Sequence, residues 1–160
     1  MTRSTVVAGV LVMAAAVPVV MGQTTNPQIG TWKMNMAKSK FSSGTGFKSA
    51  TSKIEGVSGG VKHTVDSVYA DGTSRRYEYT TTYDGKDVPM RGPFQGNTIA
   101  VTRIDSLAFE TVQKTNGKVS LTTRFAVSRD GRTLTGTSSG VDPDGVKFTN
   151  VAVYDKLTLK

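Results

Sequence analysis

The chain of 160 residues contains no cysteine, one histidine and one tryptophan. Without cysteine no disulfide can hold the fold together, and a Cys–His nucleophile pair is excluded. A single histidine leaves too few nitrogen and sulfur ligands for a zinc site, so we expect neither a metal nor another cofactor. After residue 22 the sequence also lacks any long helical hydrophobic period. These absences exclude a disulfide scaffold, a zinc protein and a mostly helical fold.

The first 22 residues predict an export signal. Residues 1–3 supply a short positive start, and residues 6–20 are almost wholly apolar. An apolar run of about 15 residues suits a signal peptide, whereas a membrane-spanning helix needs roughly 20. Cleavage after Gly22 would leave residues 23–160 as one domain, periplasmic or secreted, without a transmembrane segment.

The chain is basic, with 20 lysines and arginines against 12 acidic residues and a net charge of +8. Most of these basic residues are scattered; only Lys38 with Lys40 and Arg75 with Arg76 lie close together. A nucleic-acid-binding protein usually gathers its basic residues on one face, so we expect no nucleic-acid partner. We expect a soluble monomer whose surface charge also suits an anionic envelope polymer.

Five dipeptides predict tight turns, because each lies between stretches of β-branched and aromatic residues. Glycine takes the positive φ of such a turn without steric cost, and aspartate or asparagine tolerates it better than other residues. Short turns join antiparallel neighbours and therefore predict a meander. The dipeptides are Asp71-Gly72, Asp84-Gly85, Asn116-Gly117, Asp130-Gly131 and Asp144-Gly145.

The segments between these turns predict ten strands, of which several alternate apolar and polar residues with the period of two that a half-buried strand requires. Pro89 cannot donate to a ladder, so its strand is expected at an edge or a bulge. Strands this long favour closure into an antiparallel up-and-down β-barrel; a β-sandwich is the alternative. The strands are predicted at 30–36, 49–57, 61–70, 75–83, 86–90, 97–104, 107–115, 118–128, 133–140 and 146–156.

Both ends of this predicted domain carry a family resemblance. Gly30-Thr31-Trp32-Lys33 resembles the Gly-x-Trp start of lipocalins and fatty-acid-binding proteins, the calycin superfamily. The closing Val153-Tyr154-Asp155-Lys156 is similar to the end of the fatty-acid-binding proteins. Together with Lys38-Ser39-Lys40-Phe41, the start also resembles an uncharacterised group of exported bacterial lipocalin-like proteins.

The resemblance implies a lipocalin-like β-barrel and a division of roles among its residues. In calycins the tryptophan plugs the closed end of the barrel, and a basic side chain from the far end of the chain packs over it. Gly30, Trp32 and Lys156 would be the corresponding structural anchors here. The interior of such a barrel would bind a small apolar or amphipathic molecule.

One departure from the family concerns the ligand. Fatty-acid-binding proteins grip the carboxylate with an Arg-x-Tyr in the last strand, whereas this chain has Ala152-Val153-Tyr154. Alanine cannot replace the two charge-assisted hydrogen bonds of an arginine. Arg103 is a candidate replacement because alternation puts it on the face of Ile99 and Val101; the alternative is that it points into solvent.

The remaining interpretations concern what fills the barrel. In the first, inward aromatic residues bind the ligand, with Arg75 and Arg103 as polar contacts at strand ends. In the second, the same residues fill the core, and the loops 37–47 and 91–96, with Phe41, Phe47 and Phe94, bind a protein or an envelope polymer. The inward aromatic residues are Tyr69, Tyr77, Tyr79, Phe109, Phe125, Phe148 and Tyr154.

No catalytic constellation is visible, so we expect a binding protein rather than an enzyme. His63 lies on the face of Val61 and Val65, where a packed, hydrogen-bonded histidine is the simplest interpretation. No Gly-x-Ser-x-Gly elbow supports a Ser-His-Asp site. Residues 142–145 resemble the start of a calcium loop but lack the glutamate that such a loop requires.

Overall fold

A computed structural model describes residues 26–42, 46–93, 96–141 and 145–158. The predicted export signal at 1–22 and Phe94 lie outside these ranges. Every regular element in the described part is a strand, and all ten predicted strands are present. The strands are β1 Gly30–Met34, β2 Phe47–Val57, β3 Gly60–Tyr69, β4 Ser74–Thr81, β5 Asp84–Pro89, β6 Asn97–Arg103, β7 Ala108–Thr115, β8 Lys118–Val127, β9 Thr133–Val141 and β10 Lys147–Leu157.

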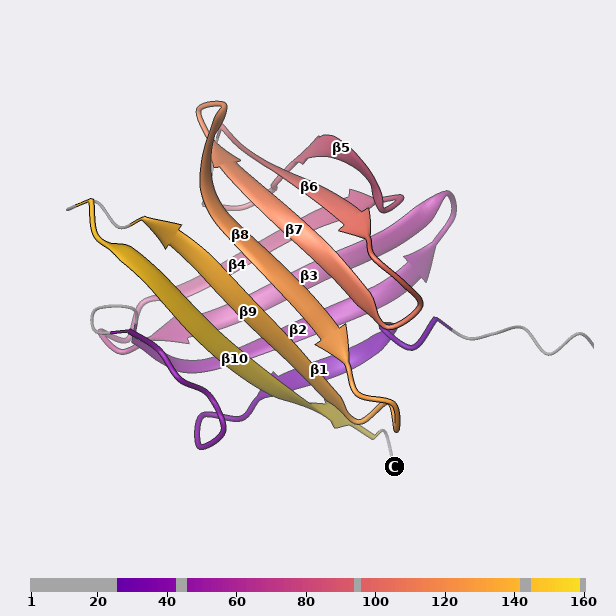
Figure 1. Ribbon diagram of the computed structural model, residues 1–160, viewed down its shortest axis with the longest axis horizontal. Helices are drawn as coiled ribbons and strands as arrows, with labels where there is room; N and C mark the ends of the chain where they lie inside the picture. The colour runs from indigo at the N-terminus through magenta and orange to yellow at the C-terminus, as the bar shows by residue number, and fades with distance from the viewer. Residues whose placement is uncertain (1–25, 43–45, 94–95, 142–144, 159–160) are drawn as a thin grey trace, which may run out of the picture.

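The strands form one antiparallel sheet in the order β4-β3-β2-β1-β10-β9-β8-β7-β6-β5. Strand β1 pairs with both β2 and β10, which joins the two ends of the chain in the middle of the sheet. Figure 1 shows the sheet curling round so that β2–β4 face β6–β9 across the interior. The prediction of a single all-β up-and-down meander is confirmed as a nearly closed barrel, and the β-sandwich alternative is wrong.

The tight turns have the predicted glycine geometry at most positions. Asn116 and Gly117 have φ angles of 50° and 78°. Positive φ at both central residues is what a two-residue hairpin turn of type I′ needs, because its twist matches that of the flanking strands. Gly72 and Gly131 also have positive φ, at 85° and 70°. These dipeptides therefore set the order in which neighbouring strands pair.

The prediction of a hairpin turn at Asp84-Gly85 is wrong. Asp84 already belongs to β5 and pairs with Thr102 of β6, and the register then shifts before Asp87. The dipeptide therefore forms a bulge, which takes one extra residue into a strand. A hairpin turn requires its two flanking strands to pair with each other, whereas β5 pairs with β6.

Strands β4 and β5 face each other across a seam where the barrel is not fully hydrogen-bonded. One backbone pair closes it: the Glu78 N–H donates to the Arg91 carbonyl, and the Arg91 N–H to the Glu78 carbonyl, each at 2.9 Å. Pro89 lies at this edge, as its missing donor predicts. The barrel therefore closes everywhere except along this seam.

The largest fully buried apolar side chains lie at one end of the barrel, which we call the closed end; they are Trp32, Phe109, Ile54, Leu134 and Val101. Trp32 is fully buried there, and its indole N–H donates to the Gln28 carbonyl at 2.9 Å. The Lys156 ammonium lies 4.9 Å from the centre of the Trp32 ring and donates to the Pro27 carbonyl. At Gly30 a Cβ would overlap the Lys156 side chain. The three predicted anchors therefore lie in contact.

We predict that Gly60→Ala destabilises the protein whereas Gly56→Ala does not. A Cβ at Gly60 would lie 2.5 Å from the Thr81 carbonyl oxygen, which is backbone and cannot move aside. Such overpacking costs about 1–3 kcal/mol. At Gly56 the nearest atom is a methyl of Ile29 at 3.4 Å, so alanine fits and should stabilise by about 0.4–1 kcal/mol. Urea denaturation checks this, and equal effects of the two substitutions would contradict it.

Candidate ligand cavity

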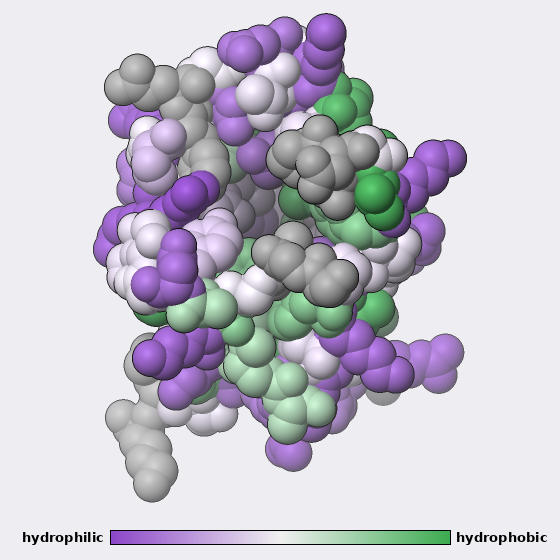
Figure 2. Space-filling view, turned by 90° about the vertical axis from the view of Figure 1, so that its left-hand side faces the viewer, coloured by the Kyte–Doolittle hydropathy of each residue, from purple (hydrophilic) through white to green (hydrophobic). Residues whose placement is uncertain are grey.

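The interior of the barrel contains adjoining cavities. Two of them enclose about 320 Å³ each, and a third, nearer the closed end, encloses about 70 Å³. Tyr77, Leu121 and Tyr154 line all three, so the cavities lie next to one another. We call the end of the barrel that carries Phe47 and Phe148 the open end; Figure 2 looks onto it and shows the surface hollowed there.

Alternation along the strands positions the aromatic lining of this cavity. The inner faces of β3, β4, β7, β8 and β10 each supply at least one ring, because every second side chain points inward. All seven aromatic residues predicted to face inward line at least one cavity. They are Tyr69, Tyr77, Tyr79, Phe109, Phe125, Phe148 and Tyr154.

Several of these rings contact one another and form apolar clusters on the cavity wall. The rings of Phe109 and Phe125 stack with centroids 4.9 Å apart. At the open end Phe47 lies 4.9 Å from Tyr69 and 5.6 Å from Phe41, again between ring centroids. Phe41 and Phe47 were predicted as loop residues for a partner; the structure places both on the cavity wall.

Small polar side chains interrupt this apolar wall. The hydroxyls of Thr123 and Ser138 lie 2.9 Å apart, and Asn150 accepts hydrogen bonds from the backbone N–H and hydroxyl of Ser42. Sequence reasoning missed these residues, although alternation places Thr123 on the face of Leu121. A hydroxyl suits either face of a strand, so residue type alone did not mark them.

Ionised side chains are absent from the lining as far as the structure describes it. No lysine, arginine, aspartate or glutamate borders the three cavities within residues 26–42, 46–93, 96–141 and 145–158. Burial raises the pKa of Tyr154 to about 12 and also raises those of Tyr77 and Tyr79. Their hydroxyls therefore stay protonated and neutral at any physiological pH.

His63 belongs to a packed aromatic cluster beside the innermost cavity. Its Nε2 lies 3.0 Å from the Tyr83 hydroxyl, and its ring stacks on Tyr79 with centroids 4.8 Å apart. Burial lowers its pKa to about 4, because the imidazolium would lose its hydration there. The prediction of a packed, hydrogen-bonded histidine is confirmed.

The two arginines considered as polar contacts for a ligand lie at opposite ends of the barrel. Arg103 is the last residue of β6; it is exposed, and its guanidinium lies 4.9 Å from the centre of the Tyr83 ring at the closed end. It borders none of the three cavities, so the solvent-facing alternative is the one observed. Arg75 is also exposed and lies over Tyr69 at the open end, at 5.0 Å.

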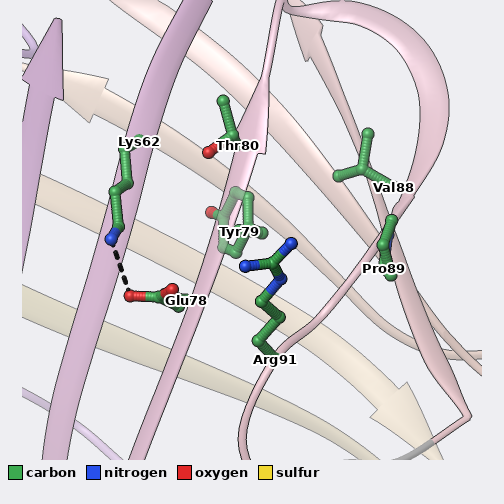
Figure 3. Close-up of a pocket in the computed structure, with 7 residues that line it drawn as sticks. All are labelled: Lys62, Glu78, Tyr79, Thr80, Val88, Pro89 and Arg91. Carbon is green, nitrogen blue, oxygen red and sulfur yellow. Dashed lines mark ion pairs between the residues drawn. The ribbon is translucent and has the colours of Figure 1, made fainter. Parts of the chain in front are cut away.

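A fourth cavity, of about 260 Å³, lies at the seam between β4 and β5. Figure 3 shows the Lys62 ammonium on β3 paired with the Glu78 carboxylate on β4, and Arg91 reaching toward them from beyond β5. The ion pair measures 2.8 Å, and its hydrogen bond lowers the pKa of Glu78. The charged side chains that line this fourth cavity thus partly compensate one another.

By sequence, neither a known protein family nor a curated protein matches this chain. The resemblance to calycins therefore rests on the motifs at the two ends and on the barrel, which is compatible with that fold. Within the described residues we find no helix of the length and apolarity needed to cross a membrane.

Proposed function

We propose that this protein is an exported lipocalin-like barrel that binds a small apolar or amphipathic molecule in its interior. The observation that carries the proposal is the group of adjoining interior cavities, two of which measure about 320 Å³ each. Small-molecule sites in proteins usually measure about 300–1,000 Å³ and combine an apolar lining with a few polar groups. The aromatic wall, with its scattered hydroxyls, has this composition.

The size of the cavity favours this proposal over the filled-barrel alternative. A barrel that acts only through its outer surface does not need an internal cavity, and protein interiors normally pack with few voids. Each unfilled volume costs stability, about 24 cal/mol per Å³ in measured cavity series. A ligand in the hollow would regain contacts that the bare wall lacks.

The arrangement of Trp32 and Lys156 at the closed end also supports a calycin-like binding protein. The resemblance implies a basic side chain packed over the tryptophan, and the Lys156 ammonium lies over the Trp32 ring. Because the buried Trp32 ring fills the closed end, we propose that the ligand enters at the open end. Export would follow from the apolar segment at residues 6–20.

The proposal predicts that the chain binds the neutral dye Nile red and that Ala152→Trp weakens this binding at least about tenfold, which corresponds to about 1.4 kcal/mol. Ala152 on β10 borders the open-end cavity, so an indole there occupies the ligand's space. Ala126→Trp is the matched control, because Ala126 on β8 is exposed on the outer face. Dye fluorescence during titration measures both affinities.

Two results would contradict the proposal. The first is a folded chain, residues 23–160, that takes up neither Nile red nor any other apolar probe. The second is equal weakening by Ala152→Trp and Ala126→Trp, since binding would then not depend on the interior.

A further inference from the structure

We infer that the ligand of this cavity is electrically neutral: an amphipathic molecule with a hydroxyl, carbonyl or amide head group, and neither a carboxylate nor a phosphate nor an ammonium. The inference rests on the proposed function and adds the chemical class of the ligand.

The first argument is the charge of the wall. The described lining supplies phenyl rings, phenols, aliphatic side chains, thioethers, hydroxyls, amides and the neutral imidazole of His63, and it supplies no ionised group. An ion moved from water into such a space loses its hydration, which costs several kcal/mol unless a partner charge compensates it. A neutral head group has no such penalty, because hydroxyls and amides can hydrogen-bond it.

The second argument concerns the cavity wall beside Ala152, which carries no side chain that could compensate a charge on the ligand. Ala152 faces inward from β10 between Asn150 and Tyr154, all three bordering the open-end cavity. The partner of Ala152 across the β9–β10 ladder is Gly136, so the wall here consists of two of the smallest residues. A long cationic side chain at Ala152 would reach the ligand, and the methyl group that is present cannot pair with an anion.

The third argument is where the nearby cations are held instead. At the open end the Arg75 guanidinium lies over the Tyr69 ring, 5.0 Å from its centre, and Arg75 is exposed. At the seam the Lys62 ammonium pairs with Glu78 at 2.8 Å, and Lys114 pairs with Asp87 at 2.7 Å. These three cations lie on the wall or outside it. Within the described residues, none of them borders any of the three interior cavities.

The polar groups that do face the cavity suit a neutral head group. Thr123 and Ser138 form a hydroxyl pair at 2.9 Å; one hydroxyl donates to the other, which leaves one O–H donor and the free lone pairs for a ligand. Asn150 adds an amide, and Tyr77 and Tyr154 add protonated phenols. A ligand hydroxyl or carbonyl can exchange hydrogen bonds with such groups without any change of charge.

The test compares three ligands of the same chain length: 1-decanol, decanoate and decylammonium, each displacing Nile red from residues 23–160 at pH 8. We expect decanol to displace the dye at least about tenfold more effectively than either ion, a margin of about 1.4 kcal/mol. Displacement by decanoate or decylammonium as effective as that by decanol would overturn the inference while leaving the proposed function in place. Failure of Nile red and all three ligands to bind would instead overturn the proposed function.

A gain-of-function variant provides a second test. Ala152→Arg should shift the preference toward decanoate, at least about tenfold relative to decanol, because the guanidinium can make two charge-assisted hydrogen bonds to the carboxylate. Ala152→Met is the size-matched control and should weaken both ligands alike. Emission from the buried Trp32 shows whether each variant is folded. A folded Ala152→Arg chain that still rejects decanoate would contradict the inference that missing charge sets the preference.

Discussion

Replacing Trp32 with alanine is expected to lower the free energy of unfolding by about 3–5 kcal/mol, the usual cost of deleting a buried tryptophan side chain. Trp32 has no exposed surface and lies at the closed end, where it contacts the segment before β1 and the Lys156 side chain. Deleting the indole leaves a cavity where the two ends of the chain meet. Small domains are stable by about 5–15 kcal/mol, so much of the total would be lost.

Circular dichroism during urea denaturation is the measurement for this variant, because the only tryptophan is removed. Trp32→Phe is the control. It keeps most of the ring but loses the hydrogen bond to Gln28, which is worth about 1 kcal/mol. A loss of less than about 1 kcal/mol for Trp32→Ala would contradict the anchoring role.

Acidification from pH 7 to pH 4 is expected to destabilise the fold by about 3 kcal/mol through His63 alone. Burial lowers the pKa of His63 to about 4, against an ordinary value of 6.5. Above pH 6.5 the ring is neutral in both states and contributes no pH dependence. Below pH 6.5 His63 binds a proton in the unfolded chain but not in the folded chain, so the free energy of unfolding falls until the pH reaches about 4.

The surroundings of His63 make the upper part of this pH window, from 6.5 to about 5, specific to it. Its ring packs against Tyr79, Tyr83 and Phe109, which are neutral throughout, and the Arg103 guanidinium lies over the Tyr83 ring. Several carboxyl groups have pKa values held below their usual range by hydrogen bonds, so their contribution to stability is lost below about pH 5. They are Asp71, Glu78, Asp84, Asp130 and Asp155.

His63→Gln is the control for this prediction. Glutamine keeps an amide that can hydrogen-bond the Tyr83 hydroxyl but does not titrate. The free energy of unfolding, measured by urea denaturation at several pH values, should then change little between pH 6.5 and about 5. The same decline in both proteins would show that another group causes it.

Strand positions were predictable because they depend on local patterns. Each predicted strand is present, and its ends differ from the observed ends by at most two residues. Alternation likewise indicated which aromatic residues face inward, since the side-chain period of a strand is fixed at two. The prediction for Asp84-Gly85 failed because a turn motif reports its own φ angles and not which strand lies beside it. Here the neighbour is β6, and the motif became a bulge.

The position of Arg103 shows a second limit of the same kind. Alternation correctly places it on the face of Val101, but alternation does not say where along the barrel axis the interior ends. Arg103 lies at the end of its strand, so its side chain is exposed. The polar wall residues Thr123, Ser138 and Asn150 escaped prediction because their residue types occur on both faces of a strand.

The sequence by itself determined the all-β meander, the inward aromatic residues and the lack of the ligand-gripping arginine, because turn chemistry, alternation and residue identity are local properties. Only the tertiary structure decided that the barrel closes except at the β4–β5 seam. It also decided that the largest fully buried side chains lie with Trp32 at one end. It also decided that the inward rings surround a cavity instead of filling it. Whether inward side chains meet depends on the curvature of the whole sheet. That curvature cannot be inferred from the residue pattern of any single strand.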